Sequence, residues 1–297
     1  MIVNQENLAS MYIALNTIFN NAFKDTKSFY ERVAMVVPSN ARSNDYKFML
    51  QFPMLQEWIG DRVIKSLSAQ SFTIENKNYE VTIEIDGNDI QDDNIGIYNP
   101  IIGELGRAAA QHPDKLVAEL LNGAFSTVCF DGQNFIDTDH PVGSGTQTNH
   151  GGGTSDPWFV LDTTRNIKPF IFQRRTMPQL VRQDRPDHEN YFMRNKFRYG
   201  VDYRGAAGYG LWQLAYGSKD TLNSTNLRAA IIAMKNFTND EGEPLGITPN
   251  LLVVSPNNMF AARDILLSNF VLGDGTAGGA KSNTDMGILD LLVVDWL

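Results

Sequence analysis

Acidic side chains and two histidines gather in one stretch of this sequence, and they are its best candidates for binding a metal ion. The members of this group are Asp131, Asp137, Asp139, His140 and His150. Carboxylate oxygens and imidazole nitrogens clustered in a loop can hold a divalent cation. The spacing matches no defined metal motif, however, and Asp and His beside Pro141 are ordinary turn residues. We therefore expect a plain loop without metal. The enzymatic alternative is a metal-dependent hydrolase that uses Asp137, Asp139 and His140.

Two other patterns could carry chemistry, and both are weak. The glycine-rich residues 275–282 resemble a phosphate-binding loop, but Ala280 stands where a glycine must precede the lysine. That stretch also follows an expected helix instead of a strand, so a mobile surface loop is the better interpretation. No Gly-x-Ser-x-Gly motif accompanies the four histidines, which lie beside proline, glycine or acidic residues. We expect no catalytic residue, no cofactor and no enzyme.

Basic residues dominate residues 165–204. This segment contains ten Lys and Arg residues and four acidic residues, which gives it a net charge of +6. Aromatic residues are interleaved with them, so a nucleic-acid surface is one interpretation and a solvated strand face is another. Because the whole chain has a formal net charge of −9, we favour a third interpretation, in which the basic segment meets acidic patches on other subunits. The residues expected on its contact face are Arg194, Lys196 and Arg198.

The elements that would position these residues begin with a strand pattern in residues 189–217. From Met193 to Arg204, apolar residues recur at odd positions and charged residues at even ones, which is typical of a half-buried strand. A break is expected over residues 205–210. The apolar residues 211–216 would then form a second strand that is buried on both faces.

Upstream, residues 72–86 predict a hairpin, because two apolar-rich runs flank a polar turn at residues 76–78. A lone hairpin is marginal in water, so it must pack on its own domain or be held by another subunit. Residues 7–23 predict an amphipathic helix with a core-facing stripe. Residues 92–123 predict a helix that is kinked or restarted at Pro113.

The remaining pattern predicts shorter elements. Residues 143–153 contain too few apolar side chains to pack and predict a flexible surface loop. Further segments are expected as strands at residues 158–161, 170–172, 250–255 and 288–297, helices at 225–236 and 257–268, and a glycine-rich loop at 273–279.

Sequence blocks along nearly the whole chain resemble the major head subunit of Mu-like phages and prophages. No single block is decisive, but their order and spacing make the match specific. They lie at residues 58–62, 65–68, 92–98, 104–110, 112–113, 131–133, 137–141, 168–173, 200–204 and 244–247.

The resemblance implies an α+β capsid protein of the Hong Kong 97-type fold. It divides the chain into an N-terminal arm at residues 1–43, an extended hairpin called the E-loop at 44–88, a peripheral domain with a spine helix at 89–220, and an axial domain at 221–297. The arm would reach along neighbouring subunits, which is the alternative to a core-facing helix. The E-loop would cross a neighbour, so the contact candidates on it are Phe72, Ile74, Tyr79 and Val81.

The implied function is structural: self-assembly into the hexamers and pentamers of an icosahedral head that encloses double-stranded DNA without specific recognition. Implied partners are further copies of the chain, a scaffolding protein, a portal and a maturation protease. The implied location is the virion capsid, after synthesis and assembly in the bacterial cytoplasm. An encapsulin-like shell with an enzyme cargo is the alternative within shell formation.

Composition agrees with a shell protein. With 42% hydrophobic and 20% charged residues, the 297-residue chain should fold, as one large domain or two. Net negative charge argues against a dedicated nucleic-acid binder. The single cysteine, Cys129, excludes an intrachain disulfide framework and suits a reducing cytoplasm. We expect neither a signal peptide nor a membrane span, because no stretch approaches roughly 18 apolar residues.

Overall fold

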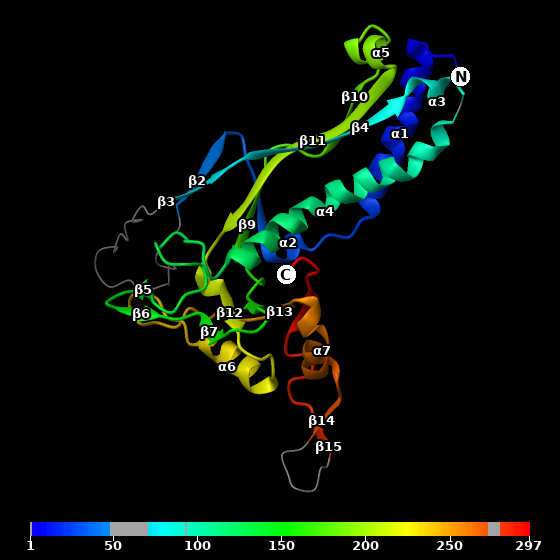
Figure 1. Ribbon diagram of the computed structural model, residues 1–297. Helices are drawn as coiled ribbons and strands as arrows, with labels where there is room; N and C mark the ends of the chain where they lie inside the picture. The colour runs from blue at the N-terminus through cyan, green and yellow to red at the C-terminus, as the bar shows by residue number, and fades with distance from the viewer. Residues whose placement is uncertain (1, 48–70, 93, 273–279) are drawn as a thin grey trace.

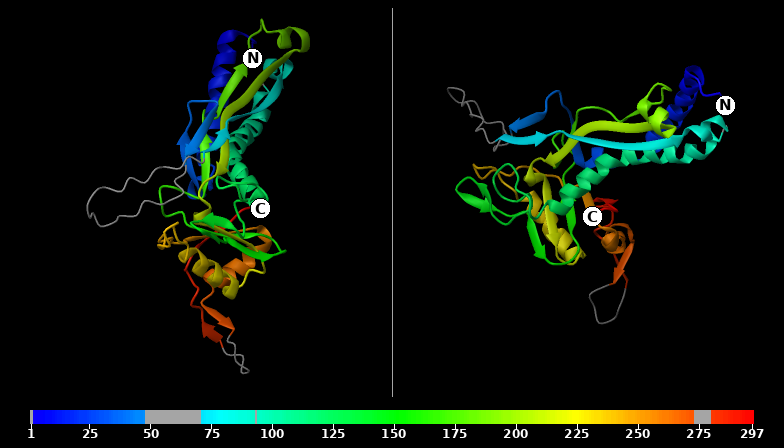
Figure 2. Two further views of the ribbon diagram at one scale, coloured as in Figure 1. Left: turned by 90° about the vertical axis from the view of Figure 1, so that its left-hand side faces the viewer. Right: turned by 45° about the horizontal axis from the view of Figure 1, so that its top comes forward.

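The computed structural model describes residues 2–47, 71–92, 94–272 and 280–297, which form two connected bodies (Figure 1). An elongated upper body contains one five-stranded sheet and two long helices, and a rounder lower body contains a second five-stranded sheet. Figure 2 shows that α5 (Glu189–Arg194) and the start of α1 (Gln5–Asp25) lie together at the far end of the upper body. The predicted mixture of helices and sheets is confirmed.

The first sheet is organised around one long strand, β11 (Lys196–Tyr209). Its first half pairs antiparallel with β4 on one side and β10 on the other, and its second half pairs with β9. Phe197, Tyr199, Val201 and Tyr203 alternate along β11 and are all buried, as the period of the sequence predicted. The other strands of this sheet are β1 (Ala34–Pro38), β4 (Lys77–Asp86), β9 (Phe170–Arg174) and β10 (Gln179–Gln183).

Two long helices, α1 and α4 (Asn99–Gly123), cover the buried face of this sheet. The predicted stripe of α1 is buried inside its own subunit, so its core-facing interpretation holds. Close approach of the helices requires Gly106, because a Cβ there would lie 2.5 Å from the backbone oxygen of Phe19. α4 continues through Pro113 as one helix, so no second helix starts there. The buried stripe of α1 consists of Leu8, Met11, Leu15 and Phe19.

The second sheet has the strand order β16-β13-β8-β12-β7. Every residue of β8 (Trp158–Leu161) and β13 (Leu251–Val254) is buried, as expected for central strands covered on both faces. The predicted segments at 158–161, 225–236, 250–255 and 257–268 are confirmed. Around β8 and β13 lie β7 (His150–Gly153), β12 (Ala215–Lys219), β16 (Asp290–Val293), α6 (Ser224–Lys235) and α7 (Met259–Leu267).

This sheet joins segments from both sides of the expected domain boundary between residues 220 and 221. β7, β8 and β12 precede that boundary, and β13 and β16 follow it. The lower body therefore includes residues well before 221.

Further short elements lie outside the two five-stranded sheets. Three are hairpins: β2 (Ser43–Lys47) with β3 (Ser71–Glu75), β5 (His140–Val142) with β6 (Gly145–Gln147), and β14 (Phe270–Leu272) with β15 (Ala280–Ser282). The short helices are α2 (Tyr30–Val33), α3 (Gly87–Gln91), η1 (Ile95–Tyr98), η2 (Trp212–Leu214) and η3 (Pro256–Asn258).

The predicted hairpin over residues 72–86 is wrong. β3 and β4 follow one another with only Asn76 between them, and they pair with β2 and β11 instead of with each other. A single intervening residue cannot reverse an antiparallel pair, whose tightest common loop has two residues. Asn76 is buried, and its amide nitrogen donates to Ser39 Oγ at 2.8 Å and to the Ala41 oxygen at 2.9 Å. The hairpin in this region is β2–β3.

Two boundaries in residues 189–217 also differ from the prediction. Met193 and Arg194 belong to the short helix α5, which ends at Asn195 in a left-handed conformation (φ 52°), so the strand starts at Lys196. Most of the expected break at 205–210 is instead strand, because β11 continues to Tyr209 through the small residues 205–208. Trp212–Leu214 form the 3₁₀ helix η2, and the next strand, β12, begins at Ala215.

Residues 143–153 are not a flexible loop. They contribute β6 and β7, and Asn149 between them is completely buried. The tip of the expected E-loop and most of the glycine-rich stretch at 275–282 lie outside the described residues. The phosphate-loop interpretation therefore concerns residues that are mostly outside the described part of the chain.

Candidate functional site

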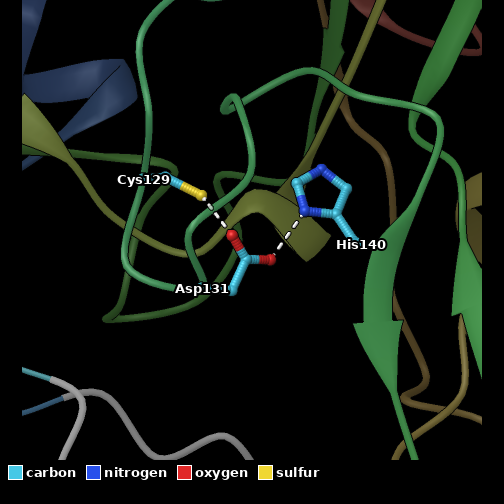
Figure 3. Close-up of side chains that lie close together, drawn as sticks. All are labelled: Cys129, Asp131 and His140. Carbon is cyan, nitrogen blue, oxygen red and sulfur yellow. Dashed lines mark hydrogen bonds and ion pairs between the residues drawn. The ribbon is translucent and has the colours of Figure 1, made fainter. Parts of the chain in front are cut away.

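The candidate metal loop is organised around one buried carboxylate. Figure 3 shows the Asp131 carboxylate between the sulfur of Cys129 and the imidazole of His140. His140 Nδ1 lies 2.7 Å from Asp131 Oδ2, and Cys129 Sγ donates to Oδ1 at 3.0 Å. The side chains of His140 and Asp131 are 0% and 2% exposed. Hydrogen bonds therefore already connect all three ligand-type groups.

Both ring nitrogens of His140 face acceptors. Nε2 lies 3.1 Å from Asn149 Oδ1, and the Asn149 amide nitrogen donates to the backbone oxygens of Phe135 and Ala215, which fixes the orientation of the amide. An imidazole that carries a proton on each nitrogen would donate to both acceptors, and the Asp131 carboxylate would then be its counter-ion. The ring also stacks on Trp212, with 4.0 Å between centroids.

Titration of the neighbouring groups agrees with this arrangement. Burial acts to raise the pKa of Asp131, but hydrogen bonds from His140 and Cys129 outweigh it and lower the pKa below its usual value. Burial raises the pKa of the Cys129 thiol, and the Asp131 carboxylate raises it further, so the thiol stays protonated and unreactive.

The other residues of the expected metal group are not part of this cluster. Asp137 accepts hydrogen bonds from the backbone N–H groups of Asn134 and Thr138, and Asp139 is exposed. His150 Nδ1 accepts from Gly152 N. Within the described parts of the chain, Cys129, Asp131 and His140 form the one cluster that could surround an ion. Asp137 and Asp139 are not members of this cluster, so among the described residues the three groups of the hydrolase alternative, Asp137, Asp139 and His140, do not surround a common ion-sized space.

Sequence reasoning missed one member of this cluster, Cys129, and two residues that contact His140, namely Asn149 and Trp212. Cys129 is two residues from Asp131, which is a local signal that could have been used. Asn149 and Trp212 come from distant segments, and only the fold brings them to His140.

Several basic residues of this segment pair with acidic groups of their own chain. Lys196 Nζ and Arg198 Nε lie 3.1 and 2.8 Å from the carboxylate of Glu84 on β4. These hydrogen bonds lower the pKa of Glu84, Arg198 contributing most. Arg174 Nη2 lies 3.2 Å from Glu31 Oε1. The net charge of +6 was counted over residues 165–204 alone. That count omitted the acidic residues of β4, which the fold places beside β11.

The three basic contact candidates thus differ. Lys196 and Arg198 lie on β11 and have partners, whereas Arg194 is exposed on α5 and forms no ion pair with the described residues. The expectation that all three share one strand face is wrong.

The four apolar contact candidates differ in their exposure. Ile74 is 5% exposed, and Phe72 is partly buried. The Tyr79 ring packs on His112 and Tyr203, with centroid distances of 4.4 and 5.2 Å. These three residues line a groove beside α4. Val81 remains 41% exposed.

This chain matches a known protein family and is similar in sequence to two named proteins. Residues 8–297 match the family model described as "Mu-like prophage major head subunit gpT". The chain is 39% identical over its full length to the full-length major capsid protein of Escherichia phage Mu. It is 37% identical to the Mu-like prophage FluMu major head subunit of Haemophilus influenzae, with 93% of each chain covered.

A solved structure shares the fold. The structure of this chain is similar to that of a chain in the procapsid of bacteriophage JBD30, with a TM-score of 0.86 and 38% sequence identity. The match covers 99% of this chain and 100% of the JBD30 chain. Separately, among the helices of the described residues none is long and apolar enough to span a bilayer.

Proposed function

This chain belongs to the Mu-like prophage major head subunit family, and on that premise we propose that it assembles into the hexamers and pentamers of an icosahedral head around double-stranded DNA. The protein is a major capsid protein with the Hong Kong 97-type fold, a structural component of the virion that associates with copies of itself. The observation that carries the proposal is full-length similarity to a procapsid subunit, with 99% of this chain covered.

The two bodies provide a division of labour for such a shell. We assign the upper body, with α4 as its spine helix, to the peripheral domain, and the lower body to the axial domain. The axial domain then includes β7, β8 and β12 as well as residues 221–297. The β2–β3 hairpin is the stem of the E-loop, and α1 packs within its own peripheral domain.

Head assembly by this protein involves further partners. These are a scaffolding protein, a portal and a maturation protease, and the head is built in the cytoplasm of the bacterial host. Packaged DNA is enclosed without sequence recognition. The net charge of −9 and the pairing of Lys196 and Arg198 with Glu84 support a shell wall that does not bind the DNA tightly. Arg194 and Val81 are contact residues with exposed side chains.

Electron microscopy of the purified protein tests the assembly. We expect uniform closed shells when the chain is produced with its scaffolding protein. Subunits that stay monomeric at every concentration under those conditions would contradict the proposal. Analysis of the contents separates a phage head from an encapsulin-like compartment, because an enzyme cargo in place of DNA indicates the compartment.

A further inference from the structure

The α5 helix presents two large apolar side chains to solvent. Phe192 is 84% exposed and Met193 is 68% exposed, and the exposed Arg194 follows them. We call these three residues the α5 tip. Large exposed apolar side chains grouped with an exposed cation are typical of a contact surface.

Contacts on either side of the α5 tip anchor the helix to its own subunit. On the inner side of the helix, the Tyr191 ring stacks on the buried Phe197 with 4.7 Å between centroids. At the end of the helix, the Asn195 oxygen accepts a hydrogen bond from Gly87 N at 2.8 Å. A Cβ at Gly87 would lie 2.2 Å from the Asn195 side chain, so the two segments are in close contact. The exposed side chains are thus presented by an ordered helix, which reduces the entropy cost of binding.

The same chain contains an apolar groove of about 340 Å³ between β3, the last turns of α4 and the second half of β11. Small residues of β11, including Ala207, form part of its lining and leave space for a bulky group. Glu119 lines the groove, is exposed and has no ion pair within the described chain, whereas Glu75 already pairs with Arg42 at 2.7 Å. Apolar side chains that line it are Phe72, Ile74, Tyr79, Leu120 and Tyr209.

We propose that the α5 tip of one subunit docks into this groove of a second copy, with Arg194 beside Glu119. The inference rests on the proposed assembly and names one of its contacts. Within one subunit the tip and the groove lie at different places along the upper body, with α5 at its far end and β3 nearer the lower body (Figure 1). Since the two surfaces differ, the contact is head-to-tail, and such contacts repeat around a ring or across a shell.

Apolar and charged parts of the contact have separate roles. Phe192 and Met193 supply the buried area, and aromatic anchors of this kind carry much of an interface's affinity. Arg194 and Glu119 define the orientation, because charge pairs at a rim contribute more to specificity than to affinity. Lys77 also lines the groove and limits its negative charge.

Replacing the apolar anchors tests the first role. We expect the variant with Phe192→Ser and Met193→Ser to lower the yield of closed shells roughly tenfold or more, as the loss of a central aromatic anchor does. Its melting temperature should stay close to that of the wild type. The matched control is Ile232→Ser, which removes a 59% exposed side chain from α6 in the lower body and should assemble normally.

Exchanging the charges tests the pairing. Arg194→Glu alone and Glu119→Arg alone should each slow assembly, and the double variant should restore it. Assembly can be restored only if positions 194 and 119 meet between copies. The charge exchange therefore tests the proposed contact even if the apolar variant fails to fold. If the double variant does not restore assembly, the assignment of the groove as the docking site is wrong. Another segment of the chain would then occupy the groove, or the α5 tip would contact another α5 tip.

The outcomes separate this inference from the proposed function. If wild-type subunits do not form shells, the proposed assembly is wrong. If wild-type subunits form shells and the α5-tip variant forms them equally well, assembly stands and this contact is wrong.

Discussion

The Asp131–His140 pair lies inside the lower body with both side chains almost completely buried, whereas Phe192 and Met193 lie at the far end of the upper body and are mostly exposed. Each region reverses the usual distribution of polar and apolar side chains. The polar pair is tolerated inside because hydrogen bonds satisfy both ring nitrogens and the carboxylate. The apolar pair has no such compensation among the described residues of the subunit.

The difference suggests how to tell a structural feature from a contact surface in this chain. A buried polar network that is fully paired contributes to the stability and specificity of the subunit itself. An exposed apolar pair on the surface contributes little to the stability of the subunit and is available to contact a second molecule. Substitutions in the two regions should therefore separate subunit stability from assembly.

The largest effect on stability is expected from His140→Leu. This change leaves the buried Asp131 carboxylate without its cation, which typically costs about 3–5 kcal/mol. Urea unfolding of the unassembled subunit, followed by fluorescence, measures the loss, and Trp212 is a built-in reporter because it stacks on the His140 ring.

A second variant makes this test specific. Adding Asp131→Leu to His140→Leu removes both charges and should recover part of the lost stability, because an apolar replacement of a buried ion pair is often neutral. If the double variant is less stable than the single one, the pair is not ionised in the folded protein.

A second buried carboxylate, Asp114, should behave in the opposite way to Asp131. It is 2% exposed and accepts hydrogen bonds from the backbone N–H groups of Phe29 and Tyr30, at 2.9 and 2.8 Å. Burial outweighs these hydrogen bonds and raises the pKa of Asp114 from 3.8 to about 6. The folded subunit therefore holds this proton more tightly than the unfolded chain does.

The sign of the pH effect follows from that difference. The stabilising contribution of Asp114 is complete below about pH 4 and is lost as the pH rises through about 6, an effect of roughly 3 kcal/mol. Asp114→Asn keeps an acceptor for both N–H groups but cannot titrate. The difference in unfolding free energy between wild type and Asp114→Asn should change over this pH range and be constant above pH 7. A constant difference throughout would contradict the raised pKa.

How far the sequence allowed these regions to be foreseen depends on the range of the interactions involved. The periodic pattern of residues 7–23 and 92–123 was sufficient to predict α1 and α4, because helical amphipathicity is local. The buried residues of β11 followed from their alternation. In contrast, the pairing of β4 with β11, instead of with β3, depends on which distant strand is nearby, and the sequence does not contain that information locally.

The candidate site was harder to predict for the same reason. Asp131 and His140 were identified as a group, but the ion pair is completed by Asn149 and Trp212, which tertiary packing brings to it. The α5 tip was missed because Met193 happened to fit the alternation of the following strand. The left-handed residue that ends α5 is Asn195, a residue type that tolerates this conformation, and it was the available signal of a boundary.

A smaller effect is expected on the open face of the first sheet, where charged groups are exposed but paired. Arg198→Met should cause at most a small loss of stability, because Lys196 remains beside Glu84 and exposed ion pairs contribute little. It should leave the salt dependence of assembly unchanged, since Arg198 pairs within its own chain. Light scattering during assembly at several salt concentrations measures this, and a clear change would return Arg198 to the subunit contact.

The smallest effect on stability is expected at Phe192, and a matched phenylalanine five residues away makes the comparison direct. Phe197 is completely buried on β11, so Phe197→Ala should cost about 3–5 kcal/mol through lost apolar burial and the resulting cavity. Phe192→Ala should change the unfolding free energy by no more than about 0.5 kcal/mol, as expected for an exposed position. Urea unfolding of the two unassembled variants measures both values. Comparable losses at the two positions would mean that Phe192 packs within its own subunit, and the α5 tip would then cease to be a contact surface.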